Sequence, residues 1–204
     1  MTIEQLELLP LKVARARPQE PIKREAEIDG FFRWTLRRAW GAGPPVGWVC
    51  LNPSVASAET DDPTCWEMMC HSLRLGFGSM VVTNIYAYRA TYPRTLKRWI
   101  GGNRHYCPPM TFENGQRAGV ALKDVGKIIC GWGNHARQID IDAFLENIAS
   151  VIIEDTAILI NSKDYPVPLY CLGTTESGAP KHPLARGKHR IAADQPLLPW
   201  KMPT

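Results

Sequence analysis

The chain has 204 residues, of which 45% are hydrophobic and 22% are charged. This composition is typical of a single globular domain with a buried core. No apolar run approaches the roughly 20 residues that span a bilayer, and the acidic start of the chain lacks a secretory signal, so we expect a cytoplasmic protein with no membrane partner. The net charge of +4 permits an anionic partner without requiring one.

The first residues mix Pro, Arg and Glu without a clear period. We therefore predict an amino-terminal arm over residues 1–25 and a single domain over residues 26–204. Apolar runs then alternate with segments of helical period. The predicted strands are residues 30–40, 46–51, 79–88, 127–133 and 167–174. The predicted helices are residues 63–76, 92–101, 113–126 and one that follows Asn134 as its cap. This alternation predicts an α/β fold, namely a three-layer α/β/α sandwich with a mostly parallel central sheet.

The first two predicted strands differ in character. Residues 30–40 alternate apolar positions with Arg33 and Arg37, which indicates a half-buried strand. Residues 46–51 are continuously apolar, as in the centre of a sheet, and we expect the two strands to pair. The next helix begins at Pro63, with Asp61 or Asp62 as its N-cap, which leaves the other carboxylate free.

Polar residues recur where the predicted strands end. The central strand runs into Asn52, the following one reaches Asn84, and the third ends near Asn134. Ligands of open parallel sheets bind beyond the carboxyl ends of the strands, so these tips predict a site. The chain has no dinucleotide fingerprint, phosphate-binding P-loop or nucleophile elbow.

The cysteines and the blocks of charged residues limit which classes of ligand the protein is expected to bind. Six cysteines form no C-x-x-C pair, so we expect free thiols, no metal site and no cofactor. The segment KHPLARGKHR, residues 181–190, holds four formal positive charges and no acid, which favours a phosphate-rich ligand.

Four motifs follow one another along the chain: VCLNPSVAS, MVVTNIYAYRATYP, VGKIICGWGNHA and APKHPLARG. In the same order, they resemble the first motif, the second strand, the glycine-ended strand and the His-Pro motif of the uracil-DNA glycosylase-like superfamily. More closely, LNPSVASAETDDPT, TNIYAYRAT, WGNHA and HPL resemble a bacterial and phage family known as a domain of unknown function, from about Phe31 to Arg190. Ser54 replaces the usual glycine and Lys-His-Pro-Leu the usual His-Pro-Ser-Pro, which suggests a modified or non-uracil base.

The resemblance implies a DNA glycosylase that acts on a flipped base in duplex or single-stranded DNA, as a monomer. Asn52 would position water, Asp61 or Asp62 would supply a carboxylate, and His182 would donate to the leaving base. The expected base-binding residues are Ser54, Trp66, Asn84, Tyr86, Trp132 and Asn134. The expected DNA-binding residues are Arg89, Lys181, Leu184 as a wedge, Arg186 and Lys188. No lysine stands out as a Schiff-base nucleophile, so the enzyme would be monofunctional.

Other interpretations stay open at this point. Asn52 and Asn84 are also suited to turns, and Trp66 and Trp132 to a core. The same fold would serve a nucleic-acid or nucleotide-binding module without catalysis, or a nucleoside or nucleotide hydrolase. Repair and defence against phage are alternative roles for a glycosylase. A site in which both adjacent aspartates face away from the pocket would favour binding alone.

Overall fold

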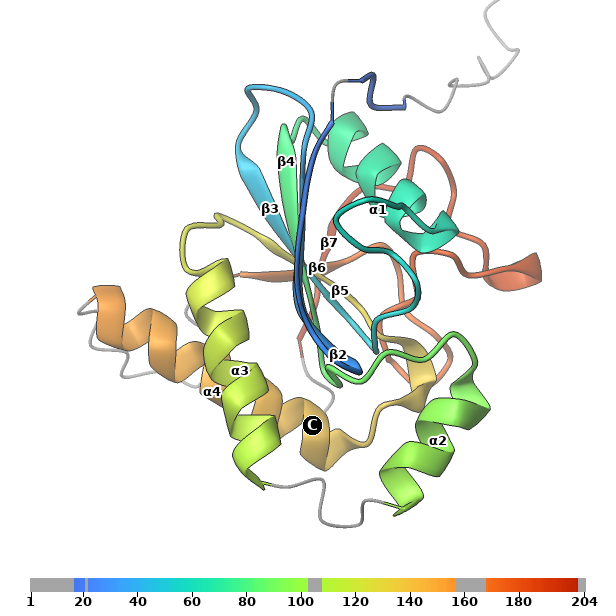
Figure 1. The fold of residues 1–204 in the computed structure, drawn as a ribbon. Helices are drawn as coiled ribbons and strands as arrows, with labels where there is room; N and C mark the ends of the chain where they lie inside the picture. The colour runs from blue at the N-terminus through green and yellow to red at the C-terminus, as the bar shows by residue number, and fades with distance from the viewer. Residues whose placement is uncertain (1–16, 21, 103–107, 157–167, 202–204) are drawn as a thin grey trace, which may run out of the picture.

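The computed structural model describes residues 17–20, 22–102, 108–156 and 168–201 (Figure 1). In this part of the chain, seven strands form one sheet in the order β1-β2-β4-β3-β5-β6-β7. They are β1 Lys23–Asp29, β2 Phe32–Ala39, β3 Pro45–Cys50, β4 Ser79–Asn84, β5 Ile128–Gly131, β6 Leu169–Cys171 and β7 Leu198–Pro199. The four central strands are mutually parallel, whereas β1, β2 and β7 run antiparallel to their neighbours.

The α/β class is therefore confirmed, but the sheet is mixed rather than mostly parallel. Of the three antiparallel strands, β2 was predicted from its alternation, whereas β1 and β7 were not predicted. β1 begins at Lys23, inside the range predicted as an arm, and β7 has only two residues. The expected pairing of β2 with β3 is wrong, because β4 lies between them and β5 occupies the other edge of β3.

Helices cover both faces of the sheet (Figure 1). They are α1 Pro63–Arg74, α2 Pro93–Gly102, α3 Pro108–Leu122 and α4 Gln138–Thr156. α1 packs on one face, where Met68 and Met69 join the same apolar cluster as Trp48. α3 and α4 pack on the other face, where Leu122 and Phe144 belong to a second apolar cluster. None of the described helices is long and apolar enough to cross a membrane.

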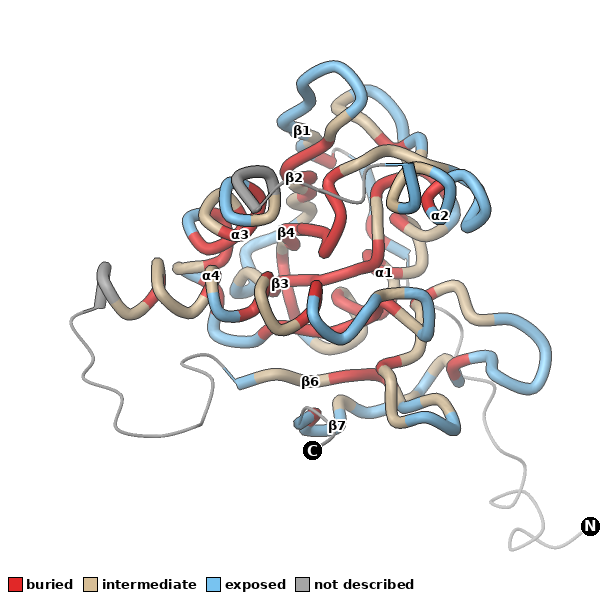
Figure 2. The backbone as a smooth tube through the Cα atoms, turned by 90° about the horizontal axis from the view of Figure 1, so that it is seen from below, coloured by how far each residue is buried: buried red, intermediate tan, exposed pale blue. Residues whose placement is uncertain are grey.

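The central strands explain why their sequence is continuously apolar. Along β3, Val46, Trp48 and Cys50 belong to the cluster on the α1 side. Val49 and Leu51, the residue directly after the strand, belong to the opposite cluster. A strand with helices on both faces has no solvated side, so period-two alternation disappears. Figure 2 shows β3 and β4 buried along most of their length.

The start of α1 follows the sequence prediction. Asp62 is the N-cap, its Oδ1 accepts from the Cys65 backbone N–H at 2.8 Å, and Pro63 occupies the first turn. Gly76 adopts φ +86° directly after the cap residue Leu75, as expected at a helix end. This helix start places Asp62 at the sheet edge where β3 ends.

Two other expectations about helices change. Asn134 lies in a 3-10 turn and caps no helix, because α4 begins four residues later. α3 begins at Pro108, five residues before the predicted start of this helix at Glu113. α4 extends as far as Thr156, and residues 157–167 lie outside the described residues.

Candidate functional site

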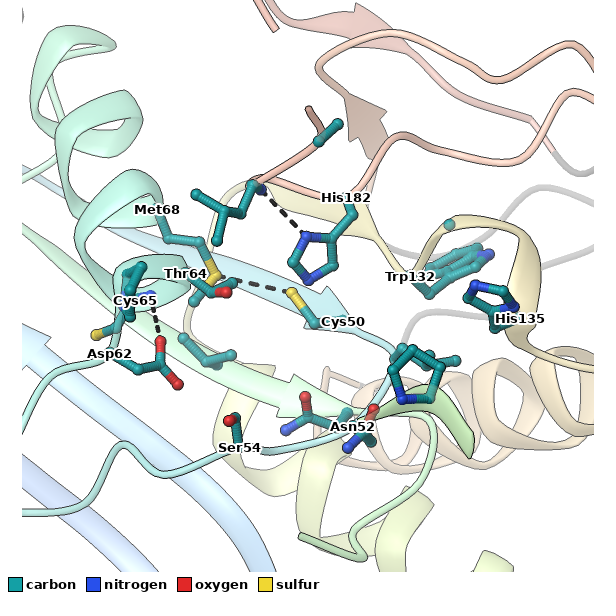
Figure 3. A pocket seen from close by; sticks show the side chains of 18 of the residues that line it. Cys50, Asn52, Ser54, Asp62, Thr64, Cys65, Met68, Trp132, His135 and His182 are labelled. Atoms are coloured by element: carbon teal, nitrogen blue, oxygen red, sulfur yellow. Dashed lines mark hydrogen bonds between the residues drawn. The ribbon is translucent and has the colours of Figure 1, made fainter. Parts of the chain in front are cut away.

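One cavity of about 670 Å³ lies at the carboxyl ends of the parallel strands (Figure 3). Its walls come from the ends of β3, β4 and β5, from the start of α1 and from the loop after β6. In the sheet, β3 lies between β4 and β5, so the chain first continues on one side of β3 and then crosses to the other. The cavity lies at this point, where the strand order reverses. Ligands of doubly wound sheets bind at this place, and the volume suits a nucleotide-sized ligand.

The cavity gathers ten of the fifteen residues that the sequence singled out. They are Asn52, Ser54, Asp62, Asn84, Trp132, Asn134, Lys181, His182, Leu184 and Arg186. Five others do not line it: Asp61, Trp66, Tyr86, Arg89 and Lys188. The tips of three strands and a late histidine loop therefore share one cavity.

Asn84 is a buried residue of the cavity wall whose side-chain amide lacks hydrogen-bond partners among the described residues. It is 1% exposed at the end of β4, and neither Oδ1 nor Nδ2 of its side chain has a hydrogen-bond partner in the described chain. Its backbone is held in place, because Asn114 Nδ2 donates to the Asn84 carbonyl at 2.8 Å. A buried amide without partners costs free energy unless a ligand supplies a donor and an acceptor.

Asn52 presents only an acceptor to the cavity. Its Nδ2 donates to the backbone oxygens of Pro53 at 2.9 Å and of Ala90 at 2.7 Å. Both amide protons are thereby used, and they hold the side chain in one orientation. The remaining Oδ1 can accept a hydrogen bond from water or from a ligand.

His182 enters the cavity opposite Asn52 and Ser54 (Figure 3). The Leu184 backbone N–H donates to His182 Nδ1 at 3.1 Å, so the neutral ring carries its proton on Nε2. Burial lowers the pKa of His182 below its ordinary value of 6.5, and the charge of Asp62 opposes this only in part. His182 is thus a neutral Nε2–H donor near pH 7.

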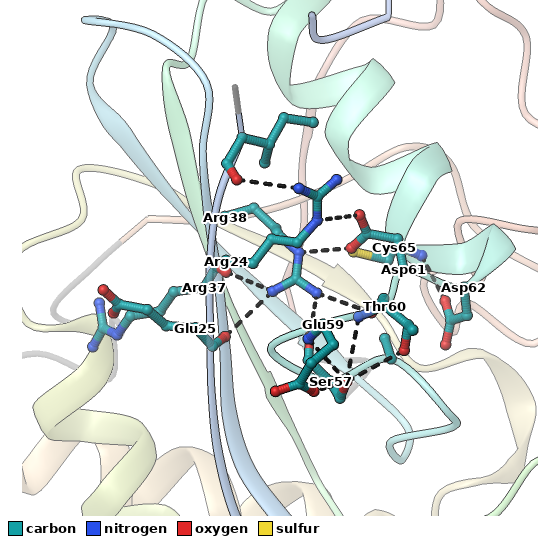
Figure 4. Close-up of polar contacts among 12 residues, drawn as sticks. Arg24, Glu25, Arg37, Arg38, Ser57, Glu59, Thr60, Asp61, Asp62 and Cys65 are labelled. Carbon is teal, nitrogen blue, oxygen red and sulfur yellow. Dashed lines mark hydrogen bonds and ion pairs between the residues drawn. The ribbon is translucent and has the colours of Figure 1, made fainter. Parts of the chain in front are cut away.

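The two adjacent aspartates diverge (Figure 4). Asp61 turns to an ion-pair cluster, where it accepts from Arg38 Nε at 2.6 Å, Arg24 Nε at 3.0 Å and Cys65 Sγ at 3.2 Å. Asp62, 7% exposed, caps α1 through Oδ1, and its Oδ2 has no hydrogen-bond partner among the described residues. Only Asp62 lines the cavity.

The other four residues outside the cavity have structural surroundings. Trp66 packs on the apolar cluster under α1. Tyr86 is fully buried and donates to the Asp140 carboxylate, while Arg89 Nε donates to the Ser54 carbonyl at 3.4 Å. Lys188 is exposed and lies 3.6 Å from a Glu176 oxygen.

The remaining lining residues form the wall and the rim. Trp132 is 1% exposed and stands edge-on to Trp200, so it is part of the core as well as of the cavity wall. Asn134 Oδ1 accepts from Thr175 and Ser177, which fixes the neighbouring loops together. Lys181 and Arg186 lie at the rim, where they add positive charge.

Sequence reasoning missed two lining residues of chemical interest. Arg33 was assigned to the exposed face of a strand, yet it is 4% exposed and lines the cavity. Cys50 also lines it, but burial raises the pKa of this thiol to about 12, so it is no thiolate at neutral pH. Within the described ranges, no three His, Cys, Asp or Glu side chains are grouped to hold a metal ion.

Comparison with known proteins identifies a family and no relative of known structure. No curated protein matches the chain significantly, and no solved structure does. One family model matches residues 33–184, a range that begins and ends with residues of the cavity wall. The chain therefore belongs to the family described as Protein of unknown function (DUF1643).

Proposed function

We propose that the protein is a monofunctional DNA glycosylase that hydrolyses the N-glycosidic bond of a flipped base, modified or other than uracil. The observation that carries the proposal is the buried Asn84 amide, which is without partners in the same cavity as Asn52, Asp62 and His182. An amide offers a donor beside an acceptor, which matches the hydrogen-bonding edge of a nucleobase. The proposal includes a uracil-DNA glycosylase-like form of the α/β fold, supported by the motif order and by helices on both faces of the sheet.

The groups in the cavity suit the two halves of the reaction. Water adds to the anomeric carbon of the sugar, and the base departs with the electron pair of the broken C–N bond. Asn52 Oδ1 would orient the water, and the free Oδ2 of Asp62 would accept its proton or stabilise the cationic sugar. The neutral His182 Nε2–H would donate to the departing base as negative charge grows on it. The products are an abasic site and the free base.

Positive charge at the rim suits a DNA strand. Lys181 and Arg186 border the cavity, and Leu184 lies between them in sequence, where it would fill the gap left by the flipped base. Because Asp62 lines the cavity, hydrolysis is favoured over binding alone. A role in defence against phage DNA with modified bases is an extension of this proposal.

The test incubates the protein with duplexes that contain uracil, mismatched thymine, alkylated bases or the hypermodified bases of phage DNA. Abasic sites are scored by alkaline cleavage, and strand breaks without alkali would instead indicate a nuclease or lyase. We expect His182→Ala and Asn52→Ala to lower single-turnover base release by about 100-fold or more while DNA retention persists. Glu146→Ala, an exposed change on α4, is the matched control.

Three outcomes would contradict the proposal. They are no abasic site from any duplex, strand breaks that form without alkali, and full activity of both site variants. Asn84→Asp adds a test of base reading, because it replaces a donor with an acceptor. We expect this variant to change which base is released, with DNA retention unchanged.

A further inference from the structure

β2 contains two buried arginines with opposite surroundings. Arg38, 1% exposed, pairs with Asp61 and donates to the backbone oxygens of Ser57 at 2.6 Å and Arg37 at 2.7 Å (Figure 4). Arg33, 4% exposed, donates through Nη1 to the Ala56 carbonyl at 3.0 Å. Its buried Nε has no partner, and no carboxylate of the described residues lies within ion-pair distance of it.

A bulge in the sheet explains how Arg33 reaches the cavity. Glu27 of β1 pairs with Thr35, but the next residue, Ile28, pairs with Arg33, so Trp34 is an extra residue in β2. Strict alternation would place Arg33 and Leu36 on opposite faces of the strand, yet both line the cavity. Bulges re-aim side chains in this way and are frequent beside functional sites.

The surroundings of Arg33 make its charge costly. The neighbouring lining residues Leu36, Cys50, Met68 and Val82 are apolar, and they belong to the buried cluster on the α1 side. Burial lowers the pKa of Arg33 to about 10, which still leaves the guanidinium charged at neutral pH. Asp62 adds an opposite charge only at longer range. A buried cation whose N–H donors lack partners is unfavourable unless an anion pairs with it and accepts their hydrogen bonds.

We propose that Arg33 is the anion-binding residue of this cavity and that the ligand places an oxyanion, a carboxylate or a phosphate, against it. The inference rests on the proposed function, since it assigns a substrate class to the same site. The oxyanion has two sources: a carboxylate on the base itself, or the phosphate of the extruded nucleotide. Guanidinium groups bind both through paired N–H donors, and the low-polarity wall strengthens the contact.

The experiment measures calorimetric binding of matched free ligands, so that it needs no base release. Orotate against uracil and 5-carboxycytosine against cytosine test the base carboxylate. A deoxynucleoside 5′-monophosphate against its deoxynucleoside tests the phosphate. We expect the unchanged protein to bind the anionic member of at least one pair at least tenfold more tightly, and the pair that responds identifies the source.

Variants test whether the preference for the anionic ligand depends on Arg33. Arg33→Gln should remove the preference, whereas Arg33→Lys should retain part of it. Arg98→Gln removes one exposed positive charge outside the cavity and should keep the full preference. Circular dichroism checks that each variant is folded, and if Arg33→Gln is not, Arg33→Lys and the unchanged protein still decide the question.

Two results would overturn the inference. One is equal binding of neutral and anionic members by the unchanged protein. The other is a preference that survives in Arg33→Gln, keeps its full size in Arg33→Lys or is lost equally in Arg98→Gln. Failure of the glycosylase proposal is a separate result, because an inactive protein can still prefer the anionic ligand, and an active one can lack that preference.

Discussion

Replacing Asp61 and Asp62 separately with asparagine distinguishes the aspartate that stabilises the fold from the one proposed to act in base release. Asp61→Asn keeps the shape of the side chain but removes the charge that faces Arg38, whose side chain is 0% exposed. Removing one partner of a buried ion pair costs about 3–5 kcal/mol, because the other charge stays buried without compensation. Asp62→Asn keeps a good N-cap, since asparagine caps helices about as well as aspartate, so we expect a loss below about 1 kcal/mol.

The assay is urea and thermal unfolding followed by circular dichroism. A loss of about 3–5 kcal/mol in a chain of this size lowers the Tm by about 6–20 °C. Base release should show the reverse order: Asp62→Asn lowers it, and Asp61→Asn leaves it nearly intact at temperatures where the variant is folded. Equal stability of the two variants would refute the division of roles between Asp61 and Asp62.

The pH dependence of stability offers a second measure of the same cluster. Burial acts to raise the pKa of Asp61, but hydrogen bonds from Arg38, Cys65 and Arg24 outweigh it and lower that pKa below 3.8. The stability that this carboxylate contributes is therefore present above about pH 4 and is lost as the pH falls through the folded pKa. The difference between the unchanged protein and Asp61→Asn should shrink in that acidic window, and a constant difference would contradict the cause we assign.

Two further predictions concern the neutral histidine and a close backbone contact between Gly78 and Gly43. Nitrogen NMR should show His182 protonated on Nε2 at pH 7, with Leu184 N–H bonded to Nδ1 and a titration midpoint below 6.5; a midpoint above 6.5 would contradict the burial argument. This site's contribution to stability is then complete above pH 6.5 and declines as the pH falls below it. Gly78→Ala would place a Cβ 2.2 Å from Gly43 N, so we expect a loss of about 1–3 kcal/mol in urea unfolding. Gly126→Ala, with nothing within 4 Å of its Cβ, should be near neutral, and equal losses would disprove the steric reason.

The centre of the sheet and the start of α1 could be predicted from local sequence. Continuous apolar runs marked β3 and β5, and the adjacent aspartates before Pro63 marked the helix start, although they did not show which of the two is the N-cap. These signals are local, since each depends on neighbours within a few residues. The strand tips could be predicted to converge for the same reason, because the carboxyl ends of parallel strands share one edge.

The edges of the sheet and the face of Arg33 could not be predicted in this way. β7 consists of two residues and exists only because β6 lies beside it. The alternation in β2 was real in sequence, but the register shift against β1 breaks it between Arg33 and Thr35. A bulge depends on the partner strand, which lies elsewhere in the chain, so period-two reasoning placed Arg33 in solvent.

The same limit applies to which polar residues act on a ligand. Asp61 and Asp62 are identical neighbours, and Arg33 and Arg38 lie on one strand, yet one member of each pair is fully partnered and the other is not. What distinguishes them is the set of donors and acceptors that distant segments bring, and this becomes visible only after folding. Because buried polar groups are almost always satisfied in folded proteins, the unfilled bonds of Asn84 and Arg33 point to a ligand more strongly than any motif does. The chemistry of that ligand should therefore complete both: an amide-like edge for Asn84, and an oxyanion for Arg33.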